Sequence, residues 1–238
     1  MVYAAVFAGG KGSRMGNIDT PKQYLELGGK PVLIHTVEKL YVNDRVDELI
    51  VLCPKPWIAH TKDLIKKFIP KGKKISVIEG GKTRNGTLEN AIEFIKKNGT
   101  VDDDTVILTH DAVRPFLTHR IINENVDAAL EYGAADTVIP ATDTIVESAG
   151  DNLISSIPDR SRMFQGQTPQ TFRLKILDEV LSSLTEDEKA ILTDACKIFT
   201  LKGKKVYMVE GEVFNIKITY PYDMKVANTL LKGKDADD

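Results

Sequence analysis

The chain has 238 residues, 42% of them hydrophobic, which is enough to bury the core of one large α/β domain or of two small ones. Its formal net charge of −2 provides no general basic field, so nucleic acid is not an expected partner and any anion site must be local. No apolar run approaches the ~20 residues of a membrane span, and the start lacks the basic region of a secretion signal. Cys53 and Cys196 match no metal-ligand spacing and are expected to be buried thiols in a reducing compartment. We therefore expect a cytoplasmic protein without a membrane segment.

The first predicted element is a buried strand at residues 2–8, which opens into a loop rich in glycine and positive charge. The glycines are Gly9, Gly10 and Gly12, and the cations are Lys11, Arg14 and Lys22. Glycines let main-chain N–H groups approach an anion closely because no Cβ stands in the way, and Arg and Lys neutralise its charge. Ligands of open α/β sheets bind at this edge, beyond the carboxyl ends of the strands. The loop therefore predicts a polyphosphate site.

Strands and helices alternate from residue 48 to residue 140. Apolar runs typical of strands buried on both faces occupy residues 48–53, 74–78, 105–109 and 136–140. Helical patterns occupy residues 56–69 and begin again after Thr83 and Thr118, whose side chains can cap a helix, and Gly133 is placed to end the last one. The alternation predicts an α/β fold with a Rossmann-like, mostly parallel sheet and helices on both faces.

The pattern changes at about residue 141. Short β-favouring pieces at residues 143–147 and 153–157 are separated by a Gly-Asp-Asn turn, which favours a protruding β-arm over another strand–helix unit. The remaining expected elements are helices at 174–184, 186–199 and 222–231 and a strand at 205–209. We expect a single domain over residues 1–238, with residues 141–170 as the arm.

Three interpretations of the glycine-rich loop compete. A dinucleotide-binding fingerprint needs a glycine where the chain has Met15, and an acidic residue after the second strand, where it has Cys53 and Pro54. A P-loop fails because no Gly-Lys-Ser/Thr follows at the required spacing. A plain glycine-rich turn with solvated cations does not explain why Arg14 and Lys22 both lie beside the end of the first strand.

Five motifs, in the same order, resemble one enzyme family over nearly the whole chain. Residues 8–15 (Ala-Gly-Gly-Lys-Gly-Ser-Arg-Met), with Pro-Lys-Gln at 21–23, are similar to the signature of sugar-phosphate nucleotidylyltransferases. Residues 110–115 (His-Asp-Ala-Val-Arg-Pro) resemble the cytidylyltransferase branch specifically. The other three motifs are residues 168–170, 192–194 and 215–219.

The resemblance implies a reaction in which a phosphate oxygen of the acceptor attacks the α-phosphorus of CTP and pyrophosphate leaves. The nucleophile is already an anion at neutral pH, so no general base is needed, and the sequence shows no Ser/His or His/Asp constellation. Catalysis must then come from alignment and charge stabilisation. Because two anions have to meet, protein cations and a divalent metal, Mg²⁺, are implied.

The resemblance also implies roles for individual residues. The catalytic cations would be Arg14, Lys22 and Lys217. The nucleotide-binding residues would be Ala8, Gly9, Gly10, Lys11, Gly12, Gly81, Asn85, Thr87, Asp111 and Ala112. Among them, Gly81 and Thr87 would read the base, and Asp111 would hold Mg²⁺, because a lone carboxylate that bridges to phosphates suits this ion. A turn cap is the alternative for Asp111.

The acceptor is expected to bind partly on the arm. By resemblance, the acceptor-binding residues are Arg114, Asp143, Thr144, Arg160 and Thr193. In the family the arm crosses to the neighbouring subunit, which implies a homodimer formed through residues 141–170. Without the resemblance, Asp143 and Thr144 are the start of a strand and Arg160 is a surface charge.

Two branches of the family differ in their polyol phosphate acceptor. The branch that uses 2-C-methyl-D-erythritol 4-phosphate usually has an aspartate just before the Asn-Ile-Lys segment, where this chain has Phe214. An aspartate accepts hydrogen bonds from hydroxyl groups, which Phe does not. Residues 164–170 and 214–223 also resemble the D-ribitol 5-phosphate branch. We therefore expect synthesis of CDP-ribitol for teichoic acid or a related cell-wall polymer, with the methylerythritol reaction of isoprenoid synthesis as the alternative.

Two hypotheses belong to other classes. A nucleotide-binding module without catalysis predicts the loss of a catalytic cation, yet Arg14, Lys22 and Lys217 are all present. A nicotinamide-dependent oxidoreductase predicts NAD binding.

Overall fold

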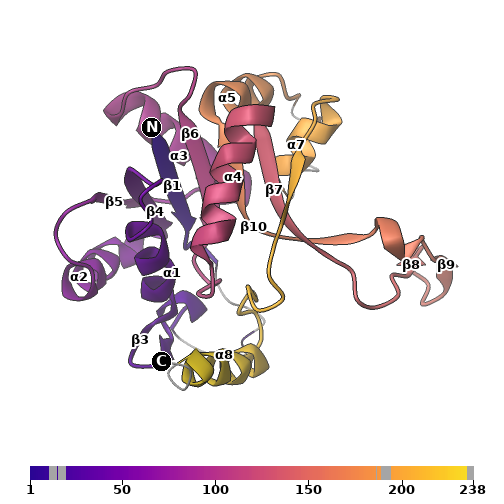
Figure 1. Ribbon diagram of the computed structural model, residues 1–238, viewed down its shortest axis with the longest axis horizontal. Helices are drawn as coiled ribbons and strands as arrows, with labels where there is room; N and C mark the ends of the chain where they lie inside the picture. Colours follow the sequence, from indigo (N-terminus) through magenta and orange to yellow (C-terminus); the bar gives the residue numbers. More distant parts are fainter. Residues whose placement is uncertain (11–14, 16–19, 186, 189–193, 235–238) are drawn as a thin grey trace.

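A seven-stranded sheet forms the centre of the molecule, in the order β11-β7-β10-β6-β1-β4-β5 (Figure 1). The structure, a computed structural model, describes residues 1–10, 15, 20–185, 187–188 and 194–234. The strands are β1 (Val2–Phe7), β4 (Glu48–Cys53), β5 (Lys74–Glu79), β6 (Val106–Asp111), β7 (Ala134–Pro140), β10 (Phe164–Arg173) and β11 (Tyr207–Glu210). The pairs β1–β4, β1–β6, β4–β5 and β11–β7 are parallel, so the predicted α/β fold with a mostly parallel sheet is confirmed.

Strand β10 runs antiparallel between β6 and β7. Phe164 pairs with Pro140 on β7, and Gln170 pairs with Thr109 on β6. Residues 164–170, which we expected to belong to the arm, are therefore part of the central sheet. The sequence does not indicate this strand, because its first half is mostly polar. It also contains Gly166 and Pro169, residue types that are depleted from strand interiors.

Helices cover both faces of the sheet, as predicted. One face packs against α1 (Val32–Tyr41), α2 (Ile58–Phe68) and α4 (His119–Tyr132), and the other against α3 (Arg84–Asn98), α5 (Leu174–Ser182) and α7 (Ala195–Leu201). Along β1, Ala4 and Val6 join the first core, whereas Tyr3 and Ala5 join the second. This double burial explains why the strand reads as an uninterrupted apolar run.

The predicted helix ends are confirmed where their capping groups are local. The Thr83 hydroxyl accepts a hydrogen bond from the Gly86 amide, and the Thr118 hydroxyl accepts one from the Ile121 amide. Gly133 ends α4 with a φ of 89°, a left-handed conformation that favours glycine. The bounds predicted for the helix at 186–199 are wrong, because Asp194 is extended and caps α7, which spans Ala195–Leu201.

Helix α1 was not among the predicted elements, although Leu33, Ile34, Val37 and Leu40 recur with helical spacing and are all buried. It follows a short 3-10 turn, Lys22–Tyr24, and a small hairpin of β2 (Glu26–Leu27) and β3 (Lys30–Pro31). These short elements lie between β1 and α1 in the chain.

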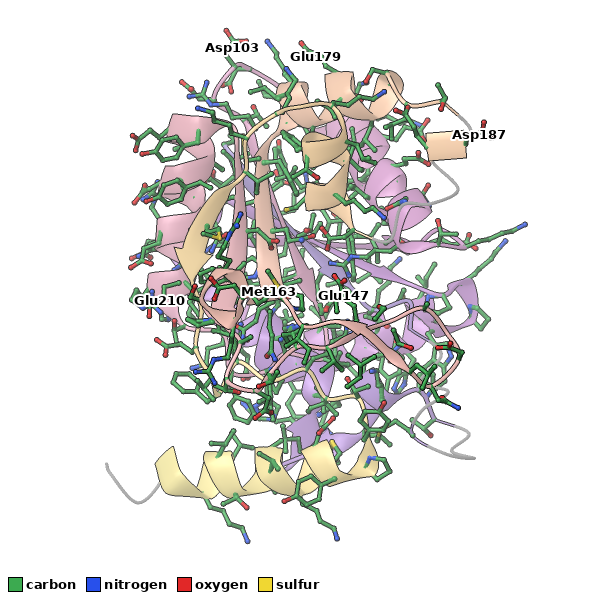
Figure 2. The ribbon with its side chains drawn as sticks, turned by 90° about the vertical axis from the view of Figure 1, so that its right-hand side faces the viewer. Asp103, Glu147, Met163, Glu179, Asp187 and Glu210 are labelled. Carbon is green, nitrogen blue, oxygen red and sulfur yellow. The ribbon has the colours of Figure 1, made fainter. Side chains whose placement is uncertain are left out.

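The carboxyl end of the sheet is covered by α8 (Pro221–Lys234). Ala227 of this helix packs with Ile218, Val113 and Phe116 in a separate apolar cluster. In Figure 2, Asp103 and Glu179 lie at one end of the molecule and α8 at the opposite end. The site described below lies toward the α8 end.

A narrow arm projects from the body between β7 and β10 (Figure 1). It contains a hairpin of β8 (Glu147–Ser148) and β9 (Ile154–Ser156) and a 3-10 turn at Arg160–Arg162. Figure 2 looks along the arm, with Glu147 and Met163 in front of the body. The predicted hairpin is present, and the projecting part spans residues 141–163. No helix in the described part of the chain is long and apolar enough to cross a membrane.

Candidate active site

A cavity of about 340 Å³ lies at the carboxyl ends of β1, β5 and β6, where α3 begins. This volume is in the range of small-molecule sites, and the place is where open α/β sheets bind ligands. The cavity is lined by Phe7, Ala8, Gly9, Gly10, Lys22, Gln23, Gly81, Lys82, Thr83, Arg84, Thr87, Asp111, Ala112, Val113 and Lys217.

Asp111, the last residue of β6, is the buried charge at the centre of the cavity wall. Arg84 donates to its Oδ1 at 2.5 Å, and Lys217 lies 2.8 Å from its Oδ2. Arg114 Nε lies 3.7 Å from Oδ2, and the Asp111 amide donates to the Thr168 hydroxyl at 3.1 Å. Three cations from separate parts of the chain thus surround one carboxylate.

The charge state of Asp111 follows from this arrangement. Burial on its own raises the pKa of a carboxyl group, but Arg84, Lys217 and Arg114 together hold the pKa of Asp111 well below its usual range. The carboxylate is therefore ionised at every physiological pH. An ionised carboxylate oxygen is the ligand that Mg²⁺ prefers, and one such ligand is enough when phosphates and water supply the others. The residues present fit a magnesium ion held by Asp111 and a polyphosphate.

The two lysines reach the cavity in different ways. Lys22 is buried, and its Nζ donates to the Ile218 carbonyl at 2.8 Å. Lys217 keeps 39% of its side chain exposed. The neighbouring Gln23 donates to the Ala8 carbonyl at 2.6 Å and so ties the segment after the glycine loop to the end of β1.

Gly9 and Gly10 expose bare backbone to the cavity. Among the described residues, no atom would lie within 4 Å of a Cβ at either position, and neither glycine has a positive φ. Packing against the described residues and backbone strain therefore do not require glycine here. Two consecutive glycines leave the main-chain N–H groups open to close approach by a ligand.

The opposite wall is the beginning of α3. The Gly81 amide donates to the Thr87 hydroxyl at 3.1 Å, and Thr87 donates to the Thr83 carbonyl at 2.9 Å. A Cβ on Gly81 would lie 2.3 Å from the Gly86 carbonyl carbon, so only glycine fits against this turn. The free amides of a helix start and its positive dipole end favour a negative ligand.

The structure brings most of the expected nucleotide-site residues to this one cavity. Those that line it are Ala8, Gly9, Gly10, Lys22, Gly81, Thr87, Asp111, Ala112 and Lys217. Asn85 lies in the first turn of α3 and does not line the cavity. The positions of Lys11, Gly12, Arg14 and Thr193 fall outside the described residues.

The expected acceptor-binding residues divide into two groups. Arg114 is buried beside the cavity, where its Nη1 donates to the Asn215 carbonyl at 2.7 Å. Asp143, Thr144 and Arg160 are exposed on the arm and line no part of the cavity within this chain. Arg160 donates to the Thr142 carbonyl, a contact within the arm itself.

Arg84 is the site residue that sequence reasoning missed. Its guanidinium pairs with Asp111 and lies 5.2 Å from the centre of the Phe7 ring. The available signal was its place in the first turn of a helix that follows two glycines, beside the end of a buried strand.

A second polar cluster lies on the same face of the sheet as Asp111, on the neighbouring strands β10 and β7. Gln170 of β10 donates to Asp136 Oδ1 at 3.1 Å and to both oxygens of Asp194. Burial, with the nearby Asp194 charge, raises the pKa of Asp136 to about 7. The Cys196 thiol lies within 4.8 Å of both carboxylates.

Comparison with known families and structures agrees with this geometry. The family model of IspD, 2-C-methyl-D-erythritol 4-phosphate cytidylyltransferase, matches residues 2–233. A solved 4-diphosphocytidyl-2C-methyl-D-erythritol synthase from Anaerococcus prevotii is 28% identical, with a TM-score of 0.78, over 97% of this chain and 96% of that chain. The 2-C-methyl-D-erythritol 4-phosphate cytidylyltransferase of Thermus thermophilus is 26% identical, with a TM-score of 0.72, over 98% and 100%. That of Francisella tularensis is 26% identical, with a TM-score of 0.75, over 96% and 98%.

The family match covers nearly the whole chain, including the strands of the sheet, the residues that line the cavity and the arm. It gives no support to a nicotinamide-dependent oxidoreductase or to a binding module without catalysis. The chain belongs to the IspD family and is a CTP-dependent cytidylyltransferase.

Proposed function

We propose that the enzyme transfers the cytidylyl group of CTP to D-ribitol 5-phosphate, giving CDP-ribitol and pyrophosphate. The observation that carries the reaction type is the cavity at the ends of β1 and β6, in which bare glycine backbone faces Asp111, Lys22 and Lys217. Such a cavity suits a polyphosphate, because bare main-chain amides and cations can surround its negative charge.

The reaction follows from charge placement. A phosphate oxygen of the acceptor forms a bond to the α-phosphorus of CTP, and the bond from that phosphorus to the pyrophosphate oxygen breaks. Lys22 and Lys217 neutralise the negative charge that gathers on the α-phosphate as the two anions meet. The amides of Gly9 and Gly10 hold the remaining phosphates in line. No proton has to move, so neither His110 nor any other base is required.

Asp111 would hold a Mg²⁺ ion, which supplies further positive charge at the phosphates. The cations that now neutralise Asp111 would then be shared between the carboxylate and the nucleotide. Lys217 is suited to this exchange, because it is the most exposed of the three. By its place in the chain, Arg14 would add a further cation on the glycine-loop side.

Base recognition would fall to the start of α3. Cytosine presents acceptors at O2 and N3 and a donor at N4, and the backbone of Gly81 and the hydroxyl of Thr87 can match them. Both residues line the cavity. Asn85, in the first turn of the same helix, would contribute only from outside the cavity lining.

The choice of ribitol rests on Phe214. This residue is 37% exposed and immediately precedes the buried Asn215. It lies three residues before Lys217 in the chain. An apolar ring at this place removes the hydroxyl-binding aspartate that is usual in the methylerythritol branch. The comparisons by themselves support the second candidate, 2-C-methyl-D-erythritol 4-phosphate, better than ribitol 5-phosphate, because the family model and the named structures carry that name.

The arm would complete the acceptor site in a homodimer. Asp143, Thr144 and Arg160 are solvent-exposed, and the hairpin beyond them exposes Leu153, Ile154 and Ile157 at 67%, 62% and 61%. An apolar, projecting hairpin is suited to dock on a second subunit. Arg114 and Thr193 would meet the acceptor from the body of the chain.

The experiment is a pyrophosphate-release assay with CTP, Mg²⁺ and either polyol phosphate as the sole acceptor. We expect turnover with D-ribitol 5-phosphate, and a kcat/KM lower by at least about 100-fold with 2-C-methyl-D-erythritol 4-phosphate. The reverse ranking moves the assignment to the methylerythritol branch. A Phe214→Asp variant is the matched test: it should narrow the preference for ribitol, whereas Val213→Asp, at the more exposed neighbouring position, should not.

A further inference from the structure

Lys217 belongs to a segment that has no regular secondary structure. Residues 211–219 form neither helix nor strand between β11 and α8. A lysine side chain has four rotatable bonds, so its position depends on how well its own backbone is fixed. The segment must therefore be held by side chains from elsewhere.

Asn215, two residues before Lys217, provides the central attachment. It is fully buried, and its Nδ2 donates to the Gln167 Oε1 and to the Thr168 carbonyl, both at 3.0 Å. Its own carbonyl accepts a hydrogen bond from Arg114 at 2.7 Å. On the other side of Lys217, the Ile218 amide donates to the Val113 carbonyl at 2.9 Å.

The same contacts lead back to Asp111. Thr168, whose carbonyl accepts from Asn215, also accepts the Asp111 amide with its hydroxyl at 3.1 Å. Arg114, which donates to the Asn215 carbonyl, has its Nε 3.7 Å from Asp111 Oδ2. Asn215 is thus joined by two short routes to the carboxylate that Lys217 meets at 2.8 Å.

We propose that Asn215 is a positioning residue that sets the Lys217 ammonium against Asp111 and the reacting phosphates. This inference rests on the catalytic role of Lys217 given above. The side chain of Asn215 touches no reacting atom; it acts through Lys217. A displacement of about 1 Å at a reacting group is enough to lower a rate about 100-fold.

The test is a double-mutant cycle on turnover with Asn215→Ala and Lys217→Ala. We expect each single variant to lower kcat by about 100-fold, with a much smaller change in the KM for CTP. Because Asn215 acts through Lys217, adding Asn215→Ala to Lys217→Ala should lower kcat no further. Losses that multiply in the double variant, or an Asn215→Ala enzyme with the parent kcat, would overturn the proposal.

Asn125 gives a matched control for the loss of a buried asparagine. It is fully buried, its Nδ2 also donates to two oxygens, on Ile121 and Thr137, and its Oδ1, like that of Asn215, has no partner among the described residues. Asn125→Ala should lower the melting temperature and leave kcat unchanged. If Asn215→Ala does not fold, Gln167→Met, which removes only one of the two acceptors, should still lower kcat and lose its effect in the Lys217→Ala background. A Lys217→Ala enzyme with the parent kcat would contradict the proposed mechanism itself, a result distinct from failure of the cycle.

Discussion

At the residue scale, the central feature is one carboxylate that pairs with three cations. Asp111 is 6% exposed and meets Arg84, Lys217 and Arg114 on its two oxygens. In the free protein the carboxylate of Asp111 offsets part of the positive charge of these three cations. A bound polyphosphate would interact with the same cations. The cluster therefore serves both the stability of the protein and the binding of the nucleotide.

Replacement of Asp111 by Asn separates these two roles. Three cations lose their partner, so we expect the free energy of unfolding to fall by about 2–3 kcal/mol, less than for a fully buried pair because Lys217 is half exposed. Without metal, pyrophosphate should bind the variant more tightly than the parent, because the repelling carboxylate is gone. Urea unfolding with and without pyrophosphate measures both effects. Equal stabilisation of parent and variant by pyrophosphate, with exposed Asp63→Asn as the control, would contradict this placement of the anion.

The raised pKa of Asp136 predicts that the free energy of unfolding falls as pH rises. A carboxyl group with a lowered pKa, such as that of Asp111, has the opposite effect. Burial, with Asp194 nearby, raises the pKa of Asp136 from 3.8 to about 7 in the folded protein. The folded state therefore keeps a proton that the unfolded state releases, and this group destabilises the protein progressively as pH rises from about 4 to about 7.

Asp136→Asn removes that cost. The gain in the free energy of unfolding over the parent should be small near pH 4 and reach roughly 1–4 kcal/mol above pH 7, since one pKa unit corresponds to about 1.4 kcal/mol. Chemical denaturation at a series of pH values measures the gain. A gain that stays constant from pH 4 to pH 8 would show that Asp136 does not titrate in this window.

At the element scale, the start of α3 forms one wall of the site because it lies directly against the turn at Gly81. A Cβ at Gly81 would lie 2.5 Å from the Thr87 amide nitrogen as well as against Gly86. The neighbouring Gly80 is different, because a Cβ there would meet its nearest atom, the Thr87 hydroxyl oxygen, at 3.4 Å. Close packing therefore requires glycine at position 81 but not at position 80.

Gly81→Ala should move the start of α3 away from β5 and weaken CTP binding by about 10-fold or more, with a loss of about 1–3 kcal/mol in stability. Gly80→Ala is the matched control and should change CTP affinity little. Calorimetric titration with CTP measures both variants. If Gly81→Ala binds CTP as the parent does, the start of α3 is not a wall of the nucleotide site.

Elements whose signals are local could be predicted from the sequence, whereas those that depend on distant pairing could not. Thr83, Thr118 and Gly133 mark helix ends through their own hydrogen bonds or backbone conformation. Strand β10 has no such signal, because its mostly polar start stays exposed and is a strand only through its pairing with β7. Arg84 likewise reaches Asp111, at the end of β6, because α3 packs against β1 and β4, which no local pattern indicates.

At the scale of the whole molecule, the described nucleotide-site residues gather at one cavity, whereas the expected acceptor residues on the arm lie away from that cavity within one chain. Residues 141–163 leave the body and expose an apolar hairpin (Figure 1). Exposure of this kind favours burial against a second copy, which would also bring Asp143, Thr144 and Arg160 to the neighbouring cavity.

Leu153→Arg combined with Ile157→Arg should convert a dimer into a monomer, because charges replace two of the three exposed apolar side chains of the hairpin. The acceptor kcat/KM should fall by about 100-fold or more, while CTP affinity is unchanged. Val42→Arg, at a position 57% exposed on the body, is the control. Sedimentation velocity and the turnover assay decide the matter: a monomeric double variant with full acceptor turnover would show that the arm does not complete the site.

The most direct test of the central claim is diffraction from crystals of the protein grown with CTP and Mg²⁺. We expect the triphosphate to lie against the Gly9 and Gly10 amides, Lys22 and Lys217, and the metal to lie between the phosphates and Asp111. A nucleotide bound elsewhere, with this cavity closed to it, would contradict the placement of the active site.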